Sequence, residues 1–242
     1  MRPFTSLVLF GMLALTSSSS LSAQLRSGGG QSRSSGISSW WFSGGTVVAG
    51  LGPVNDGRTG STWDFAGDPR WQLRGTLEKA MNPTTTFGIA VNYGNVDFEY
   101  RPLAGAPVPD VSLEAPASVA ACQVTGCQAQ VNLMGLQAVL RGGGAREGLY
   151  QIIEASAGVI GFQQFTAKSD GAQLPVERAI DLTGGLGYGF GFALSGDAHI
   201  AFVQDFGIAW HSGESLPEGT GRTYRTRNTR ITLRYGLGSL SR

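Results

Sequence analysis

Apolar residues alternate with small or polar residues along much of the chain, and the period is two. The pattern is sharpest in residues 180–194, where every second residue from Gly185 to Gly191 is glycine and the residues between are bulky and apolar. Successive side chains of a β-strand point to opposite faces, so this period predicts a strand with one bulky face and one bare face. A phosphate-cradling loop is excluded, because a dinucleotide fingerprint would require glycine where Phe190 stands.

The same alternation recurs along the chain and predicts eight strands. We expect them at residues 40–49, 70–79, 86–95, 130–141, 150–162, 180–194, 198–210 and 228–238. In the fourth segment the alternation slips near Gly135, which predicts a β-bulge. The long connections are 51–67, 101–127, 167–177 and 212–223, and the short ones are 81–84, 142–147 and 195–197. Because long and short connections alternate, we expect antiparallel strands with all tight turns at one end.

An eight-stranded sheet of this kind closes into an up-and-down barrel, and two classes of barrel share the pattern. A soluble lipocalin-like barrel buries its apolar face, whereas a transmembrane barrel turns that face to lipid. Three features favour the transmembrane class. The glycine row suits the crowded interior of a narrow barrel, whereas the aromatic side chains are too bulky for that interior. Aromatic residues such as Trp71 and Trp210 also cluster near strand ends, as they do at the two interfaces of a membrane. The sequence predicts an all-β, eight-stranded antiparallel up-and-down transmembrane β-barrel, with a secreted soluble barrel as the alternative.

Charged residues on the less apolar faces of these strands are expected to point into the lumen. An arginine facing lipid near the midplane costs roughly 2–4 kcal/mol, so several outward charges would exceed a typical stability of about 5–15 kcal/mol. The expected inward charges are Arg70, Arg74, Glu78, Glu154, Asp181, Asp205, Arg230 and Arg234. Their formal charges cancel, and buried charges require partners. We therefore expect a charged network that plugs the lumen, and we keep a small diffusion pore as an alternative.

The N-terminal residues predict export. Residues 1–23 carry one arginine, an apolar core at residues 7–15 and then small residues, which is the pattern of a secretory signal peptide. Residues 24–37 are rich in Gly and Ser and predict a flexible linker, so the barrel domain is expected at residues 38–238. The net charge is +1 and no basic patch with interleaved aromatic residues occurs, so no nucleic-acid partner is expected.

Two cysteines lie close together in the longest connection. Cys122 and Cys127 are the only cysteines, and in an exported chain they favour a disulfide over a zinc site, because no His or further Cys lies nearby. No calcium-loop spacing is matched by the polar residues of the first long connection, which are Asn55, Asp56, Asp64 and Asp68. We expect those residues to be solvated, and we expect no metal and no cofactor.

His211 and Ser212 raise the question of a catalytic pair. Adjacent residues of a strand point to opposite faces, and by parity His211 points into the lumen, away from lipid. No G-x-S-x-G elbow occurs in the chain. We therefore expect no catalytic residue and no enzyme activity, and a lipid-modifying enzyme stays as an alternative function. His199, near the opposite rim, is expected to form hydrogen bonds inside the lumen.

The architecture resembles the OmpA/OmpX-like family of small outer-membrane β-barrels over about residues 38–238. The resemblance rests on the signal peptide, the eight amphipathic strands, the alternating connection lengths and the C-terminal strand, and no family motif is matched residue by residue. The chain departs from the family at its end. Tyr235 and Leu237 are the last outward apolar residues, and the chain then continues to Arg242 instead of closing on an aromatic residue.

The resemblance implies a Gram-negative outer membrane, with the long connections extracellular and the termini periplasmic. It also implies contact with outer-membrane lipids and lipopolysaccharide, and with the barrel-assembly machinery and periplasmic chaperones during biogenesis. A structural or surface-interaction role, with an unidentified surface ligand, is the expected function.

Overall fold

The structure is a computed structural model that describes residues 40–65, 70–103, 116–212 and 222–237. These residues belong to one compact unit of the chain. The expected signal peptide and linker lie outside the described residues, as does Asp68. Within these ranges, no helix has the length and apolar character needed to cross a membrane.

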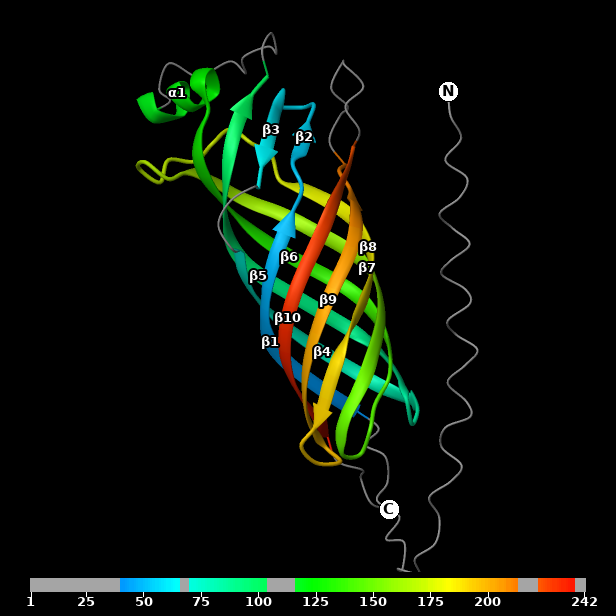
Figure 1. The fold of residues 1–242 in the computed structure, drawn as a ribbon. Coiled ribbons are helices and arrows are strands. Elements are labelled where there is room, and N and C mark those ends of the chain that lie inside the picture. The colour runs from blue at the N-terminus through cyan, green and yellow to red at the C-terminus, as the bar shows by residue number, and fades with distance from the viewer. Residues whose placement is uncertain (1–39, 66–69, 104–115, 213–221, 238–242) are drawn as a thin grey trace, which may run out of the picture. The chain divides into compact units, whose positions relative to one another are not determined.

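Eight long strands form a closed ring (Figure 1). They are β1 (Trp40–Leu51), β4 (Arg70–Asn82), β5 (Thr85–Pro102), β6 (Cys127–Gly142), β7 (Gly148–Ala167), β8 (Ala179–Ala193), β9 (Ala198–Trp210) and β10 (Thr223–Leu237). Each strand pairs antiparallel with its neighbours, and the pairings β1–β10 and β5–β6 complete the ring. The predicted all-β ring of eight antiparallel strands is confirmed.

The strands are staggered around the ring. Following paired residues from Trp40 of β1 through each strand in turn leads back to β1 at Gly50, ten residues further along. A closed barrel with such a stagger has strands that tilt by about 35–45° from its axis, and eight strands enclose an interior just wide enough for side chains to fill. The lumen is therefore a space in which side chains from different strands meet.

A short hairpin and a helix lie in the long connections, at the end of the barrel away from the tight turns (Figure 1). β2 (Val54–Asp56) and β3 (Ser61–Asp64) form a hairpin, and β3 also pairs with the last residues of β5. Helix α1 (Ala117–Thr125) precedes β6. The alternating pattern does not predict the hairpin, because three or four residues carry too little periodicity to distinguish a strand from a loop, and the nine-residue helix was not expected from the sequence either.

The bulge expected near Gly135 is absent, and that prediction was wrong. The pairing of β6 with β5 continues without a register shift over the whole of β6. The irregular step lies between Gln130 and Asn132 in the pairing with β7, where Gln164 has a φ of 56°.

The apparent slip has another cause, since the apolar residues change face along β6. Met134 and Leu136 are exposed on the outside, whereas Val131 and Leu133 are buried inside. The inner face of the barrel therefore becomes apolar towards the end that carries the hairpin and the helix.

The outside of the barrel carries the large apolar side chains. Leu73, Leu186 and Leu233, from three different strands, are 66%, 67% and 63% exposed. On β8 the residues of the glycine row from Gly187 to Gly191 are buried at every second position, and the bulky residues between them are exposed. The assignment of the bulky face to the outside and the bare face to the lumen is confirmed.

A hydrophobic core fills the barrel below the hairpin. Trp63 and Phe65, in and directly after β3, are fully buried and pack against Phe98, Phe162 and Phe165. The hairpin thus covers this end of the lumen with aromatic side chains. The sequence predicted a charged network in the lumen and did not predict this apolar core beneath the hairpin.

Candidate functional site in the barrel lumen

Glu154 of β7 is the centre of a buried ion network. Its carboxylate oxygens lie 2.6 Å from Arg230, 3.1 Å from Arg141 and 3.4 Å from Arg74. These arginines come from β10, β6 and β4, and all four side chains are buried. A carboxylate that accepts charged N–H donors from three strands has its charge compensated without water.

Two further carboxylates extend the network. Glu78 of β4 lies 2.8 Å from Arg234 and 3.6 Å from Arg141. Asp205 of β9 accepts two N–H donors of Arg230, at 2.8 and 3.2 Å. Because Arg141 and Arg230 each also contact Glu154, the network is continuous from Glu78 to Asp205.

The network includes six of the eight charged residues predicted for the lumen. They are Arg74, Glu78, Glu154, Asp205, Arg230 and Arg234. Arg70 is buried outside it, where its Nε donates a hydrogen bond to the carbonyl oxygen of Asp97 and its guanidinium lies over the ring of Phe65. Asp181 belongs to a separate cluster nearer the hairpin.

Arg141 is the member that the sequence analysis missed. It is almost completely buried and joins two carboxylates. It lies on the inner face of β6 with Val139, while Leu140 points outwards, so parity over the second half of this strand could have identified it. With Arg141 included, four arginines face three carboxylates, and the formal charge of the network is +1 instead of the expected zero.

The glycine row on β8 makes room for side chains of the neighbouring strands. A Cβ atom at Gly187 would collide with the carboxylate of Asp205, and one at Gly191 would collide with the ring of Tyr150. These bare positions allow Asp205 to reach Arg230 and allow Tyr150 of β7 to pass over β8 and reach His199 of β9.

A cavity of about 40 Å³ lies beside the network. Its lining includes Arg74, Glu154 and Asp205, together with Gly184 and Gly185 at the start of the glycine row. A polar cavity of this size accommodates a few water molecules. The glycine row therefore leaves some space for water, and side chains fill the rest.

The end of the lumen near the tight turns holds an aromatic and cationic cluster. The guanidinium carbon of Arg234 lies 4.3 Å from the ring centroid of Trp41, and this ring packs at 4.9 Å against His199. The hydroxyl group of Tyr150 and Nδ1 of His199 are hydrogen-bonded at 2.8 Å. His199 thus forms a hydrogen bond inside the lumen, as the sequence analysis expected.

A second polar cluster, which we call the outer cluster, consists of Asp56, Asp181, His211 and Tyr224. His211 follows β9 directly and places its Nδ1 atom 2.8 Å from Asp181 on β8 and its Nε2 atom 3.6 Å from Asp56 on β2. Tyr224 of β10 donates a hydrogen bond to the second oxygen of Asp181 at 2.9 Å. The outer cluster therefore ties the β2–β3 hairpin to the barrel wall.

The neighbours of His211 favour its charged form. Burial alone would lower the pKa of this imidazole, but the hydrogen bond to Asp181 and the attraction of Asp56 outweigh burial and raise the pKa to about 9. Burial would raise the pKa of Asp56, yet His211 and hydrogen bonds from Thr59 and the Arg58 backbone lower it. At neutral pH a cationic imidazole therefore lies between carboxylates.

This arrangement differs from a nucleophilic catalytic site. His211 is 1% exposed, and each of its ring nitrogens faces a carboxylate. Ser212 contributes its backbone N–H, which donates a hydrogen bond to Asp181 at 3.2 Å. The inward direction predicted for His211 is confirmed. Its carboxylate partners were not predicted. Asp181 and His211 adjoin the paired residues Leu182 and Trp210 of the consecutive strands β8 and β9, so the register of this pair could have indicated their contact. Asp56 lies on β2, a strand too short for the alternation to reveal.

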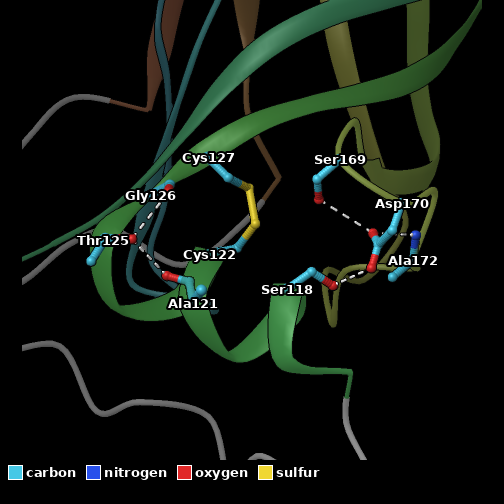
Figure 2. The surroundings of a disulfide bond; sticks show 9 residues. All are labelled: Ser118, Ala121, Cys122, Thr125, Gly126, Cys127, Ser169, Asp170 and Ala172. Atoms are coloured by element: carbon cyan, nitrogen blue, oxygen red, sulfur yellow. Dashed lines mark hydrogen bonds between the residues drawn. A yellow bond between two sulfur atoms is a disulfide. The ribbon is translucent and has the colours of Figure 1, made fainter.

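Cys122 and Cys127 form the predicted disulfide, which joins α1 to the start of β6 (Figure 2). Cys122 is buried in the hydrophobic core below the hairpin. Ser118, near the start of α1, donates a hydrogen bond to Asp170 in the connection between β7 and β8 (Figure 2). The helix is thus attached to neighbouring segments near both of its ends.

The polar residues considered for calcium make contacts within the protein. Asn55 accepts a hydrogen bond from Thr62, and Asp64 lies 3.2 Å from Arg101. The expectation of a solvated side chain was wrong for Asp56, which is buried because the hairpin folds over the lumen. Over the described ranges, no group of His, Cys, Asp and Glu is arranged to hold a metal ion.

Comparison with known proteins finds solved structures of similar architecture. No protein-family model and no curated protein matches the sequence. Neisserial surface protein A has 9% identity and a TM-score of 0.49, with 84% of this chain and 99% of that chain covered. The N-terminal β-barrel domain of Pseudomonas aeruginosa OprF has 11% identity and a TM-score of 0.39, with 81% and 98% covered. Outer membrane protein AlkL has 9% identity and a TM-score of 0.42, with 90% and 99% covered. At these identities the similarity concerns the fold alone.

Proposed function

We propose that the protein is a non-conducting outer-membrane β-barrel with a structural or surface-interaction role. The observation that carries the proposal is a filled lumen inside a ring whose outside is apolar. Large apolar side chains on the outside of every barrel strand suit lipid, because contiguous apolar surface of that extent is unfavourable in water. The same observation argues against a secreted lipocalin-like barrel.

The contents of the lumen argue against a small diffusion pore. Ion pairs around Glu154 occupy its middle, the cluster around Trp41 occupies one end, and the core around Trp63 occupies the other. A continuous water column would have to displace these side chains and separate the buried ion pairs.

The environment of His211 argues against a lipid-modifying enzyme. Such an enzyme needs an imidazole that reaches a substrate at the membrane surface, within about 2.6–3.2 Å of the group from which it takes a proton. His211 instead lies inside the barrel and is held between Asp181 and Asp56. The proposed function therefore includes no catalytic residue.

In the proposed orientation the tight turns face the periplasm, since small outer-membrane barrels keep their periplasmic turns short. The hairpin and α1 then lie at the cell surface. Exposed ion pairs, such as Arg58 with Glu177 and Lys168 with Asp97, form part of the surface offered to an extracellular partner. Outer-membrane lipids and lipopolysaccharide would surround the barrel, and the barrel-assembly machinery would insert it.

Planar-bilayer recording on the refolded protein tests this proposal. The expected result is no stable, ohmic channel. A heat-modifiability gel of the same preparation should show different mobility with and without boiling, as folded membrane barrels do. Reproducible unitary currents that change on Arg74→Ala or Asp181→Ala would favour the pore, and a protein that is soluble without detergent would favour the lipocalin-like barrel.

A further inference from the structure

Two arginines on β10 interrupt the row of apolar residues on the outside of the barrel. Arg225 and Arg227 are exposed and point outwards, on the same face as Ile231, Leu233 and Tyr235. Outward arginines are unfavourable in the apolar part of a membrane. Their position along the apolar band therefore decides whether they face acyl chains or lipid headgroups.

The register places both arginines at the edge of the apolar band. Arg227 is paired with Phe206 of β9, and Arg225 is paired with Ile208, and both partners are exposed apolar residues. From Tyr235 to Arg227 the strand advances roughly 26 Å, which a strand tilt of about 35–45° reduces to roughly 20 Å along the barrel axis. The apolar band of such barrels is about 25 Å tall. Counted from Tyr235, Arg227 therefore lies roughly 5 Å inside the far edge of the band and Arg225 lies close to that edge, where acyl chains meet lipid headgroups.

The charges of these arginines are not neutralised by the described part of the chain, in which neither residue forms an ion pair with a carboxylate. The guanidinium carbon of Arg227 lies 5.6 Å from the ring centroid of Phe206, a contact that orients the group and leaves its charge uncompensated. By contrast, the exposed residues Arg58 and Arg101 are each paired with acids.

We propose that Arg225 and Arg227 bind the phosphate group of a lipid in the outer leaflet. The inference rests on the proposed function, since it requires a membrane around the barrel and the long connections outside. A guanidinium group presents parallel N–H donors that match phosphate oxygens. The exposed apolar residues next to Arg225 and Arg227, towards the middle of the band, would contact the acyl chains of the same lipid. A phosphorylated glycolipid and an anionic glycerophospholipid share this chemistry.

Native mass spectrometry of the refolded protein in detergent tests the site. The probes are lipid A with two phosphates and, separately, phosphatidylglycerol. The double variant R225Q/R227Q should reduce the occupancy of the first bound lipid by about tenfold, because each arginine near a membrane surface contributes attraction to anionic lipid. The matched control is Lys79→Gln, which removes an outward cation from the opposite end of the barrel and should leave the occupancy unchanged.

If R225Q/R227Q loses occupancy with lipid A alone, the ligand is a phosphorylated glycolipid. If it loses occupancy with phosphatidylglycerol alone, the ligand is a glycerophospholipid. A loss of occupancy with both lipids identifies a phosphate group that either lipid supplies. Unchanged occupancy in R225Q/R227Q, or an equal fall in Lys79→Gln, would overturn the proposal. A heat-modifiability gel of each variant separates failure of the proposed membrane barrel from failure of the proposed lipid site. A protein that does not change mobility on boiling contradicts the proposed membrane barrel, whereas a folded variant with unchanged lipid occupancy contradicts only the lipid site.

Discussion

The Nδ1 atom of His211 lies 2.8 Å from Oδ1 of Asp181, and both side chains are almost completely buried. On its other side His211 faces Asp56, which belongs to the hairpin that covers the lumen. The cationic imidazole of His211 thus connects the β2–β3 hairpin to strand β8 of the barrel. The charge of this imidazole should be visible in the pH dependence of stability.

Replacing His211 with Gln should remove a pH-dependent contribution to stability. The pKa of the folded imidazole, about 9, exceeds its ordinary value of 6.5. The contribution is therefore complete below pH 6.5 and is lost as the pH rises through about 9, and at about 1.4 kcal/mol per pKa unit it reaches on the order of 3 kcal/mol. Urea unfolding in lipid vesicles should show this decline in the wild type and not in H211Q. Parallel pH profiles of the two proteins would contradict the charged state assigned to His211.

Substitution of Glu154 by Gln should destabilise the barrel strongly. It removes the shared carboxylate of Arg74, Arg141 and Arg230, and a buried charge left without its partner costs about 3–5 kcal/mol. The matched control is Glu177→Gln, whose exposed pair with Arg58 should contribute less than about 1 kcal/mol. Denaturant unfolding followed by tryptophan fluorescence compares the two variants. Similar losses of stability in both would indicate that the lumen network is solvated.

Gly189 should tolerate no side chain. A Cβ atom there would overlap the carbonyl oxygen of Phe202 and lie 2.7 Å from Cα of Val203, and both belong to the backbone of β9, which cannot move independently. Gly189→Ala should therefore cost about 1–3 kcal/mol. Gly75→Ala is the control, because nothing lies within 4 Å of its added Cβ, and its effect should stay within about 0.5 kcal/mol. Equal unfolding midpoints for the two variants would show that β9 shifts to accept the methyl group.

The disulfide should hold α1 in place and add little to the stability of the barrel. Cys122 and Cys127 are only five positions apart, and the constraint on the unfolded chain grows with loop length. The double variant C122S/C127S should keep nearly the same unfolding midpoint, while proteolysis within residues 116–126 becomes faster. A marked fall in the midpoint would mean that the disulfide also supports the core in which Cys122 is buried.

Protease added to intact cells should cut, if at all, in the long connections. These are residues 51–67, 101–127, 167–177 and 212–223. The prediction follows from the proposed orientation, in which the tight turns face the periplasm. Mass spectrometry of the released peptides locates the cuts. Cleavage at Asn82 or Gly196 in intact cells would contradict the proposed orientation, because it would place the tight turns outside the cell.

The sequence by itself determined the ring of strands and the direction of most side chains. Alternation has this power because successive residues of a strand must point to opposite faces, which is a local property of the backbone. It placed the glycine row of β8, Arg230 and Arg234 of β10 and His211 inside, and it placed the bulky apolar residues of the strands outside. The two cysteines predicted their own disulfide because they are close in sequence and have no other partner of their kind.

The tertiary structure alone decided which inward residues meet. Parity gives a side chain a face, but its neighbours across the lumen depend on the register of every pairing and on the stagger of the closed ring. Glu154 therefore acquires Arg141 as a partner, and Asp181 leaves the main network for His211 and Tyr224. Alternation also cannot reveal that the inner face of the barrel changes from charged to apolar along the barrel axis. The inner face is charged beside Glu154 and apolar around Trp63, because the hairpin folds back over one end of the barrel and excludes water there.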